Sequence, residues 1–254
     1  MRAAARENVK QGVAVVAFAW AGRALALEAE AGFSHEKLSN NNADWNSAYV
    51  EAAHTFAPRQ TVYAALREVE RFDLKDSQVE AGYYQPLSPR LAGHIEGNAS
   101  PEHNMLPKGS LFGELALQLD AGWVASGGVR KSEYTATSAR VITASLERYF
   151  GRFRALYTMN NGKPEDAGSA TGHRIGLDYY YAGERSRVGV SATWGREVEN
   201  IPPTGVLTSD VRALNIYGRH WVSPAWAITG ELGTHEQGSF YRRTGGRLGL
   251  RYAF

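Results

Sequence analysis

The sequence predicts a closed, antiparallel, up-and-down β-barrel that spans a membrane, with about 14 strands of about ten residues each. Three observations predict this fold class. The chain ends in a segment of strict polar–apolar alternation that finishes on an aromatic residue. An apolar run near the amino terminus has the form of a secretory signal peptide. Between these ends, short alternating segments recur between turn residues, and no segment shows a helical period of useful length.

The amino-terminal segment has the features of an export signal. Three basic residues precede the apolar run 13–21, and residues 24–26 form a small–x–small cleavage pattern. This run is too short to span a bilayer as a helix. We therefore expect a signal peptide over residues 1–26 and a barrel over residues 27–254, with cleavage after Ala21 as the alternative.

The central part of the chain supplies the strands. In segment 91–97, Leu91 and Ile95 fall on one face, whereas His94 and Glu96 fall on the other. The same alternation recurs in segments 174–181, 187–194 and 226–235. It is typical of strands with lipid on one side and a polar lumen on the other. If two weak hairpins lie outside the membrane, the count falls to about 12 strands.

The connections between these strands alternate in kind. Tight turns with Pro or Gly are expected at 57–59, 86–89, 120–122, 151–152, 182–184 and 222–224, and longer polar loops at 39–44, 74–76, 99–109, 133–138, 160–170, 200–210 and 237–242. Short turns on one side and long loops on the other are typical of bacterial outer-membrane barrels with both termini in the periplasm. The extracellular loop candidates are His103, Asn104, Lys108, Glu199 and Asn200.

The last strand carries a candidate assembly signal. Leu248, Leu250, Tyr252 and Phe254 alternate with polar or small residues, which gives an apolar outer face. The pattern resembles the carboxy-terminal β-signal read by the bacterial outer-membrane assembly machinery. The residues that carry it are Arg247, Gly249, Tyr252 and Phe254. The alternative is an ordinary amphipathic edge strand of a soluble domain.

The composition excludes several classes of site. The chain has no cysteine, which rules out disulfides and thiolate metal sites. Its 28 basic and 26 acidic residues give no indication of a nucleic-acid partner. High tyrosine and glycine content, with 13 and 27 residues, suits a barrel with a wet interior.

The sequence from the end of the signal segment to Phe254 resembles the YaiO family of outer-membrane β-barrels. The motifs that carry the resemblance are 44–47, 83–89, 99–104, 106–108, 147–149, 195–200, 205–210, 235–238 and the terminal strand. The resemblance implies the barrel fold and an outer-membrane location. It implies no particular activity.

Charged residues are expected to line the lumen. They are Glu28, Glu30, Glu51, Arg67, Glu80, Glu96, Glu114, Glu147, Arg154, Arg174, Asp178, Arg187, Arg219, Glu231, Arg247 and Arg251. Acidic residues dominate the early strands and arginines the later ones. Closure of the barrel is expected to bring Glu28 and Glu30 to face Arg247 and Arg251. This pattern indicates either a transverse field that acts on a passing solute or a salt-bridge network that rigidifies the barrel.

Four tyrosines are also expected to face the lumen: Tyr63, Tyr84, Tyr180 and Tyr217. A tyrosine combines an apolar ring with a polar tip, which suits the amphipathic faces of sugars. The alternative is that these rings fill a wide barrel.

Catalysis has little support in the sequence. His94 and Glu96 share one face, but no Gly-x-Ser-x-Gly motif accompanies them, and the segment 235–238 lacks the second histidine of a zinc motif. We expect no catalytic residue, cofactor or metal.

The predicted function is a narrow or gated conduit for a polar solute such as a carbohydrate or exopolysaccharide. A non-conducting structural or interaction barrel is the alternative, and a lumenal or rim hydrolase comes third. The expected partners are outer-membrane lipid and lipopolysaccharide, the β-barrel assembly machinery, and a polysaccharide or small polar solute.

Overall fold

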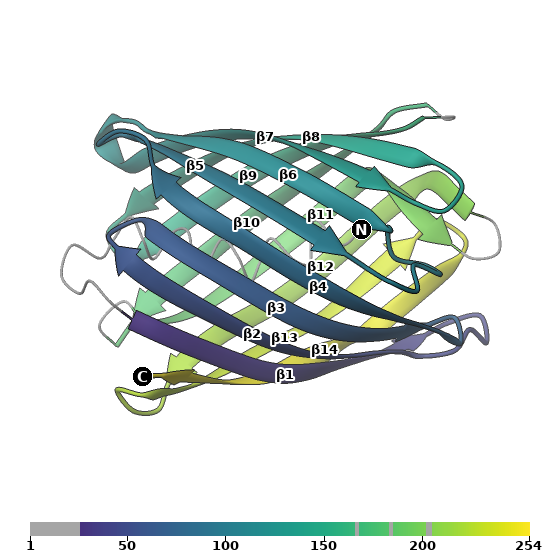
Figure 1. The fold of residues 1–254 in the computed structure, drawn as a ribbon, viewed down its shortest axis with the longest axis horizontal. Coiled ribbons are helices and arrows are strands. Elements are labelled where there is room, and N and C mark those ends of the chain that lie inside the picture. Colours follow the sequence, from purple (N-terminus) through teal and green to yellow (C-terminus); the bar gives the residue numbers. More distant parts are fainter. Residues whose placement is uncertain (1–25, 166–167, 183–184, 202–204) are drawn as a thin grey trace.

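The computed structural model describes residues 26–165, 168–182, 185–201 and 205–254. Within them, antiparallel strands form a closed barrel in which each strand pairs with its neighbours in sequence and β1 pairs with β14 (Figure 1). The predicted fold class is confirmed, with 14 strands rather than 12. Residues 1–25 of the expected signal peptide lie outside the described residues.

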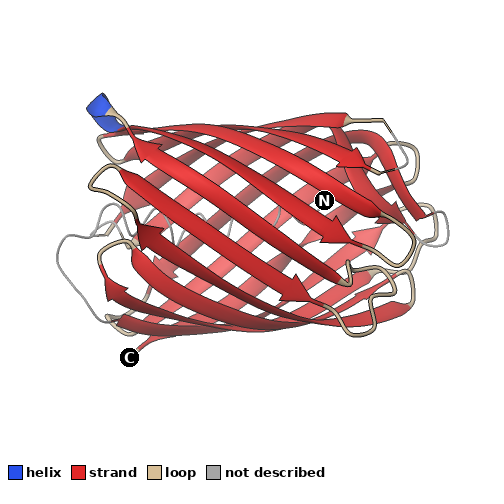
Figure 2. Ribbon diagram, turned by 45° about the horizontal axis from the view of Figure 1, so that its top comes forward, coloured by secondary structure: helices blue, strands red, loops and turns tan. Residues whose placement is uncertain are grey.

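The strands are β1 (Ala26–Leu38), β2 (Trp45–Ala57), β3 (Gln60–Arg71), β4 (Leu74–Pro86), β5 (Leu91–Ala99), β6 (Gly109–Gln118), β7 (Trp123–Glu133), β8 (Ser138–Phe150), β9 (Phe153–Pro164), β10 (Ala170–Tyr181), β11 (Ser186–Ile201), β12 (Gly205–Trp221), β13 (Trp226–Gln237) and β14 (Tyr241–Ala253). A short 3₁₀ helix, Asp120–Gly122, precedes β7 (Figure 2). No helix in the described parts of the chain is long and apolar enough to cross a membrane.

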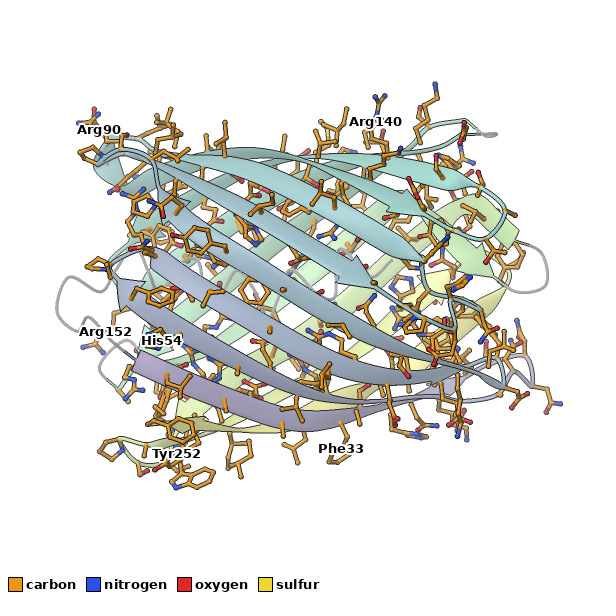
Figure 3. The ribbon with its side chains drawn as sticks, in the orientation of Figure 1. Phe33, His54, Arg90, Arg140, Arg152 and Tyr252 are labelled. Atoms are coloured by element: carbon orange, nitrogen blue, oxygen red, sulfur yellow. The ribbon has the colours of Figure 1, made fainter. Side chains whose placement is uncertain are left out.

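The two faces of the barrel differ sharply in polarity. Large apolar side chains point outward along every second position, and Leu66 and Leu232 are 61% and 65% exposed. Phe33 points away from the barrel in Figure 3. The intervening positions point inward and carry charged residues that are largely buried, such as Glu80 and Arg174. Because alternate residues of a strand face opposite sides, the sequence alternation becomes a lipid-facing surface and a polar interior.

Aromatic side chains gather at the end of the barrel where the chain terminates. The ring of Tyr252 lies 4.6 Å from that of Trp226 and 4.7 Å from that of Phe254, and Tyr252 lies at the carboxy-terminal end in Figure 3. The rings of Phe150 and Phe153 stack at 5.8 Å across the turn after β8. Such rings mark the level of the lipid headgroups in membrane barrels.

The connections at the opposite end differ in part from the prediction. Segments 39–44 and 100–108 connect strands as longer loops, whereas residues 166–167 of the expected loop 160–170 lie outside the described residues. The expected loop 74–76 is instead strand, because Phe72 and Asp73 both adopt positive φ and close a tight hairpin. Likewise, 238–240 is a short turn. The difference in connection length between the two ends of the barrel is therefore smaller than the sequence predicts.

The expected loop 200–210 is also largely strand. β11 continues to Ile201 and β12 begins at Gly205, so that Glu199 and Asn200 lie in β11 and not in a loop. Glu199 stands opposite Leu207 in the hairpin. Gly205, at the start of β12, has a φ of 91°, a conformation that favours glycine. Residues 202–204 lie outside the described residues.

Candidate functional site

The candidate site is the lumen, and all charged residues predicted to face it lie on the inward side of their strands. Buried among them are Glu30, Glu51, Glu80, Glu96, Glu147, Arg154, Arg174, Asp178, Arg187 and Arg251, and half-buried are Glu28, Arg67, Glu114, Arg219, Glu231 and Arg247. Tyr63, Tyr84 and Tyr217 are buried and Tyr180 is half-buried on the same side. The structure gathers these residues into several clusters.

The first cluster lies where the barrel closes. Arg251 Nε lies 2.7 Å from Glu30 Oε2, and Arg251 Nη1 lies 2.8 Å from Glu28 Oε2. Tyr49 Oη and Thr229 Oγ1 donate to Glu30 Oε1 at 2.6 and 2.9 Å. These contacts connect strands from the start and the end of the chain across the seam.

Arg247 does not join Glu28 and Glu30, in contrast to the expectation. Its Nη2 lies 3.6 Å from Glu231 Oε2 on β13. The reason is the strand register, which places Glu231 directly opposite Arg247.

A second cluster connects β8 to β11. Arg154 Nε lies 3.0 Å from Asp178 Oδ2 and 3.8 Å from Glu147 Oε2, and Arg187 Nη1 lies 3.9 Å from Asp178 Oδ1. Tyr149 Oη donates to Glu147 Oε2 at 3.0 Å. Arg154 and Asp178 are at most 2% exposed. Charges buried this deeply persist because they are paired.

A third cluster lines β3 to β7. Tyr63 Oη donates to Glu96 Oε2 at 2.5 Å and lies 3.0 Å from His94 Nε2. The ring of Tyr84 stacks on that of His94 at 3.9 Å, and Arg130 Nη2 lies 3.0 Å from Glu96 Oε1. The Tyr63 hydroxyl thus contacts both His94 and Glu96, and the Arg130 guanidinium contacts Glu96. Among the described residues, no group of three His, Cys, Asp or Glu is arranged to hold a metal ion.

The remaining predicted residues lie between these clusters. Arg67 Nη2 lies 3.6 Å from both Glu51 Oε2 and Glu80 Oε1. Ser126 Oγ donates to Glu114 Oε2 at 3.3 Å. Arg219 Nε donates to the carbonyl oxygen of Arg185 at 3.1 Å.

Four lumen residues that were not predicted from the sequence, Trp45, Tyr49, Arg71 and Arg243, join the predicted Arg67 and Arg247 in an array of arginines and aromatic rings on β2, β3 and β14. The guanidinium groups of Arg71 and Arg243 lie 4.1 and 4.9 Å from the ring of Trp45. Those of Arg67 and Arg247 lie 5.5 and 5.7 Å from the ring of Tyr49. The array therefore has two tiers, each an aromatic ring with two arginines at cation–π distance.

The tiers follow from strand register. Tyr49 stands opposite Arg67, and Trp45 begins the same strand four residues earlier. The alternation of Trp45, Ser47, Tyr49 and Glu51 is enough to place Trp45 and Tyr49 on the lumen face with the predicted Glu51, but it does not identify their arginine partners on β3 and β14. Arg243 lies four residues before Arg247 on the same face of β14. Its Nη1 contacts both carboxylate oxygens of Glu36, at 2.6 and 2.7 Å.

The array borders a cavity of about 150 Å³ between β1–β3 and β12–β14. Its charged lining consists of four arginines and two glutamates, namely Arg67, Arg71, Arg243, Arg247, Glu36 and Glu231. Trp45 begins β2, Arg71 ends β3 and Arg243 lies near the start of β14, so the cavity lies toward the end of the barrel opposite the carboxy terminus.

Loop 100–108 at this same end folds against β4. The Asp76 carboxylate accepts hydrogen bonds from the backbone amides of Asn104, Met105 and Leu106 at 2.9, 2.9 and 2.7 Å, and from Asn104 Nδ2 at 3.0 Å. Met105 and Leu106 are buried. The loop is therefore fixed to the rim rather than extended into solvent. Within it, the side chains of Asn104 and Lys108 are exposed and that of His103 is half-buried.

Comparison with known families shows which family this chain belongs to. The sequence profile of the YaiO membrane beta barrel domain matches residues 27–200. The chain belongs to this family. The YaiO membrane domain and the lipid-facing belt together support an outer-membrane location. No curated protein matches the sequence.

Solved structures of outer-membrane porins share the fold of this YaiO barrel. OpdO of Pseudomonas aeruginosa aligns with a TM-score of 0.52 at 10% identity, over 91% of this chain and 96% of that one. OpdQ of Pseudomonas aeruginosa gives 0.51 at 8% identity, over 91% and 98%. OmpF of Salmonella typhi, in complex with daunomycin, gives 0.50 at 7% identity, over 91% and 97%. At these identities the likeness concerns the fold alone.

Proposed function

We propose that this YaiO barrel is a narrow conduit for a polar solute, with a carbohydrate as the solute class. The observation that carries the proposal is the internal cavity with its lining of arginines and aromatic rings. A lumen that served only to fill the barrel would have its polar groups paired and packed throughout. Here a solvent-sized space adjoins the charged walls instead.

The distribution of charge supports the same function. Glutamates at positions 30, 51, 80 and 96 lie on β1–β5, whereas arginines at positions 154, 174, 187 and 219 lie on β9–β12. Opposite signs on different parts of one wall orient dipolar solutes in a confined space of low dielectric constant. Tyrosines on the same inward face offer apolar rings beside hydrogen-bonding tips.

A non-conducting structural barrel is the second candidate, and the deeply buried cluster around Arg154 favours it. Arg154, Asp178 and Glu147 fill space between β8, β9 and β10 and tie these strands together. His94 and Glu96 belong to the same kind of wall in both candidates, because Tyr63 and Arg130 already engage them. We assign them no part in catalysis.

The two candidates are separated by one double variant, Arg174→Gln with Arg219→Gln. In a conduit, removal of two positive charges from the wall shifts ion selectivity toward cations in planar-bilayer recordings and leaves the barrel folded, as read from heat-dependent gel mobility. In a sealed barrel, the wild-type protein carries no current and the variant unfolds more readily. Arg140→Gln is the matched control, because Arg140 is exposed and points away from the barrel in Figure 3. Absence of current from both wild type and double variant would reject the conduit.

A further inference from the structure

Residues that line the cavity beside the arginine–aromatic array carry buried hydrogen-bond donors that no protein atom accepts. Among the described residues, Trp45 Nε1, Arg67 Nε, Arg243 Nε and Arg247 Nε are buried and donate to no protein acceptor. All four belong to residues that line the cavity. Trp45 is 2% exposed and Arg243 is 7% exposed. A buried donor without an acceptor is costly, and four around one space point to a ligand that supplies acceptors.

The carboxylates and serine hydroxyls that line the cavity already have partners. Glu36 accepts from Arg243 through both carboxylate oxygens, and Glu231 faces Arg247. The hydroxyl groups of Ser34 and Ser47 bond to each other at 2.6 Å. Because indole and guanidinium groups only donate hydrogen bonds, the four buried donors can be satisfied only by added acceptors. Four arginines and two glutamates line the cavity, while Glu51 and Glu80 contact Arg67 from outside the lining. An acceptor placed inside the cavity therefore faces mostly guanidinium groups, which favours a negatively charged one.

The arrangement of the donors favours an extended ligand over a small ion. Trp45 and Arg243 belong to one tier, and Arg67 and Arg247 belong to the other, and the two tiers are four positions apart along each strand. Four residues of strand span about 13 Å. The cavity volume of about 150 Å³ corresponds to about five water molecules at roughly 30 Å³ each. That is the scale of a sugar ring rather than of one inorganic anion.

We infer that the cavity is a binding subsite for an anionic oligosaccharide, in which a ring carboxylate accepts from the arginine N–H groups and a ring oxygen accepts from Trp45 Nε1. The inference rests on the proposed conduit only for the route by which a sugar reaches the cavity. It adds the charge class of the solute and the place where the solute is held.

Calorimetric titration of the detergent-solubilised protein with a glucuronic acid trisaccharide tests the inference. Maltotriose is the neutral probe and inorganic phosphate is the small-anion probe. We expect saturable binding of the acidic trisaccharide and at least about tenfold weaker binding of both other probes. Equal binding of maltotriose would overturn the anionic subsite. Equal binding of phosphate would overturn the requirement for a sugar, and absence of binding by all three would overturn the inference as a whole.

Two variants with matched controls locate the site. Trp45→Phe removes the indole N–H but keeps a ring against Phe72 and Tyr241, and it is expected to weaken trisaccharide binding about tenfold. Trp226→Phe, on the outward face, is expected to leave binding unchanged. Arg247→Gln is expected to weaken binding to a similar degree, whereas Arg140→Gln is not. Undiminished binding by folded Trp45→Phe and Arg247→Gln variants would place the sugar elsewhere.

Conductance measured in the absence of sugar keeps this inference separate from the proposed function. A current without trisaccharide binding would reject the subsite and retain the conduit. Trisaccharide binding without any current would reject the conduit and retain the subsite.

Discussion

At the scale of single residues, the lumen is organised by pairing across neighbouring strands. Arg251 contacts two glutamates across the barrel seam, and Arg154 contacts two carboxylates from the strands beside its own. Removal of one partner from such a cluster leaves an uncompensated charge in a place that water does not reach. The energetic cost of removing one buried partner therefore exceeds the cost of losing an exposed ion pair.

Asp178→Ala tests this difference directly. Asp178 is 1% exposed and lies near the guanidinium groups of Arg154 and Arg187. We expect the free energy of unfolding to fall by about 3 kcal/mol, because both arginines lose a buried counter-charge. The measurement is urea-induced unfolding in lipid vesicles, followed by tryptophan fluorescence. Asp120→Ala is the control, since it breaks only the exposed pair with Arg90, and its expected cost is at most about 1 kcal/mol. Equal costs for the two variants would contradict the interpretation.

Alternation in the sequence was enough to assign these residues to the lumen, but it was not enough to assign their partners. A period of two residues fixes the face of a side chain, and every charged residue predicted to face inward does so. The partner of Arg247 depends on register, and glutamates on both neighbouring strands were available to it. Glu231 stands directly opposite, a relation that only pairing of β13 with β14 determines. The array around Trp45 escaped prediction for the same reason, because its members come from three strands.

At the scale of elements, the strands were more predictable than their connections. Membrane-spanning strands must alternate, whereas a hairpin that projects beyond the bilayer has no lipid to impose a pattern. The Asn, Pro and Thr residues of segment 200–210 favour a loop, yet β11 and β12 remain paired as far as Ile201 and Gly205. Loop 100–108 was predicted as a loop, but its attachment to β4 depends on Asp76, which nothing in the local sequence indicates.

Asp76→Ala is expected to release loop 100–108 from the rim. The carboxylate accepts three backbone amides and one side-chain amide of the loop, and the variant removes all four acceptors at once. We expect trypsin to cleave after the exposed Lys108 at least about tenfold faster, because proteolysis requires local release of the backbone. Asp73→Asn, in the adjacent turn, should leave the cleavage rate unchanged. An unchanged rate in Asp76→Ala would show that other contacts hold the loop.

Acid is expected to loosen the same loop through Glu102. The Ser77 backbone amide donates to Glu102 Oε2 at 2.9 Å, and this hydrogen bond lowers the pKa of the exposed Glu102 carboxyl. A lowered pKa in the folded state means that the contact stabilises the loop above the ordinary pKa of glutamate, about 4.3, and that this stabilisation is lost as the pH falls through the lowered value. We expect hydrogen exchange of the Ser77 amide, corrected for its intrinsic pH dependence, to accelerate in acid. In Glu102→Gln the corrected rate should not change over this range, and a wild-type acceleration retained in that variant would exclude Glu102 as the cause.

At the scale of the whole molecule, the barrel depends on closure between the first strand and the last. The backbone amide of Phe254 donates to the carbonyl oxygen of Leu27 at 2.9 Å, and the Phe254 ring packs against Tyr252 at 4.7 Å. The carboxy-terminal residue thus contributes to the seam as well as to the outward aromatic row. This position supports the proposal that the terminal strand is read during assembly.

Deletion of Phe254 is expected to impair insertion into the outer membrane without affecting export across the inner membrane. Loss of the seam hydrogen bond and of the terminal ring removes both features that the last residue supplies. Heat-dependent gel mobility of outer-membrane fractions measures the folded protein. Phe254→Tyr should restore assembly because it keeps an aromatic ring, and Phe33→Ala should assemble normally because Phe33 is outward-facing but far from the terminus. Wild-type amounts of folded protein after the deletion would contradict a signal role.

The even strand count determines which connections lie on the same side as the carboxy terminus. β1 begins and β14 ends at one end of the barrel, together with the turns at 58–59 and 87–90 (Figure 1). Loop 100–108 and the turn at 134–137 lie at the other end.

We propose that the end with the carboxy terminus faces the periplasm, so an epitope inserted between Thr135 and Ala136 should be labelled on intact cells. That turn is a better insertion site than loop 100–108, because it avoids the contacts of Asp76. An epitope inserted after Pro58 should be labelled only after the outer membrane is permeabilised, provided that gel mobility shows both proteins folded. The opposite pattern of labelling would reverse the orientation and would place the sugar-binding cavity on the periplasmic side.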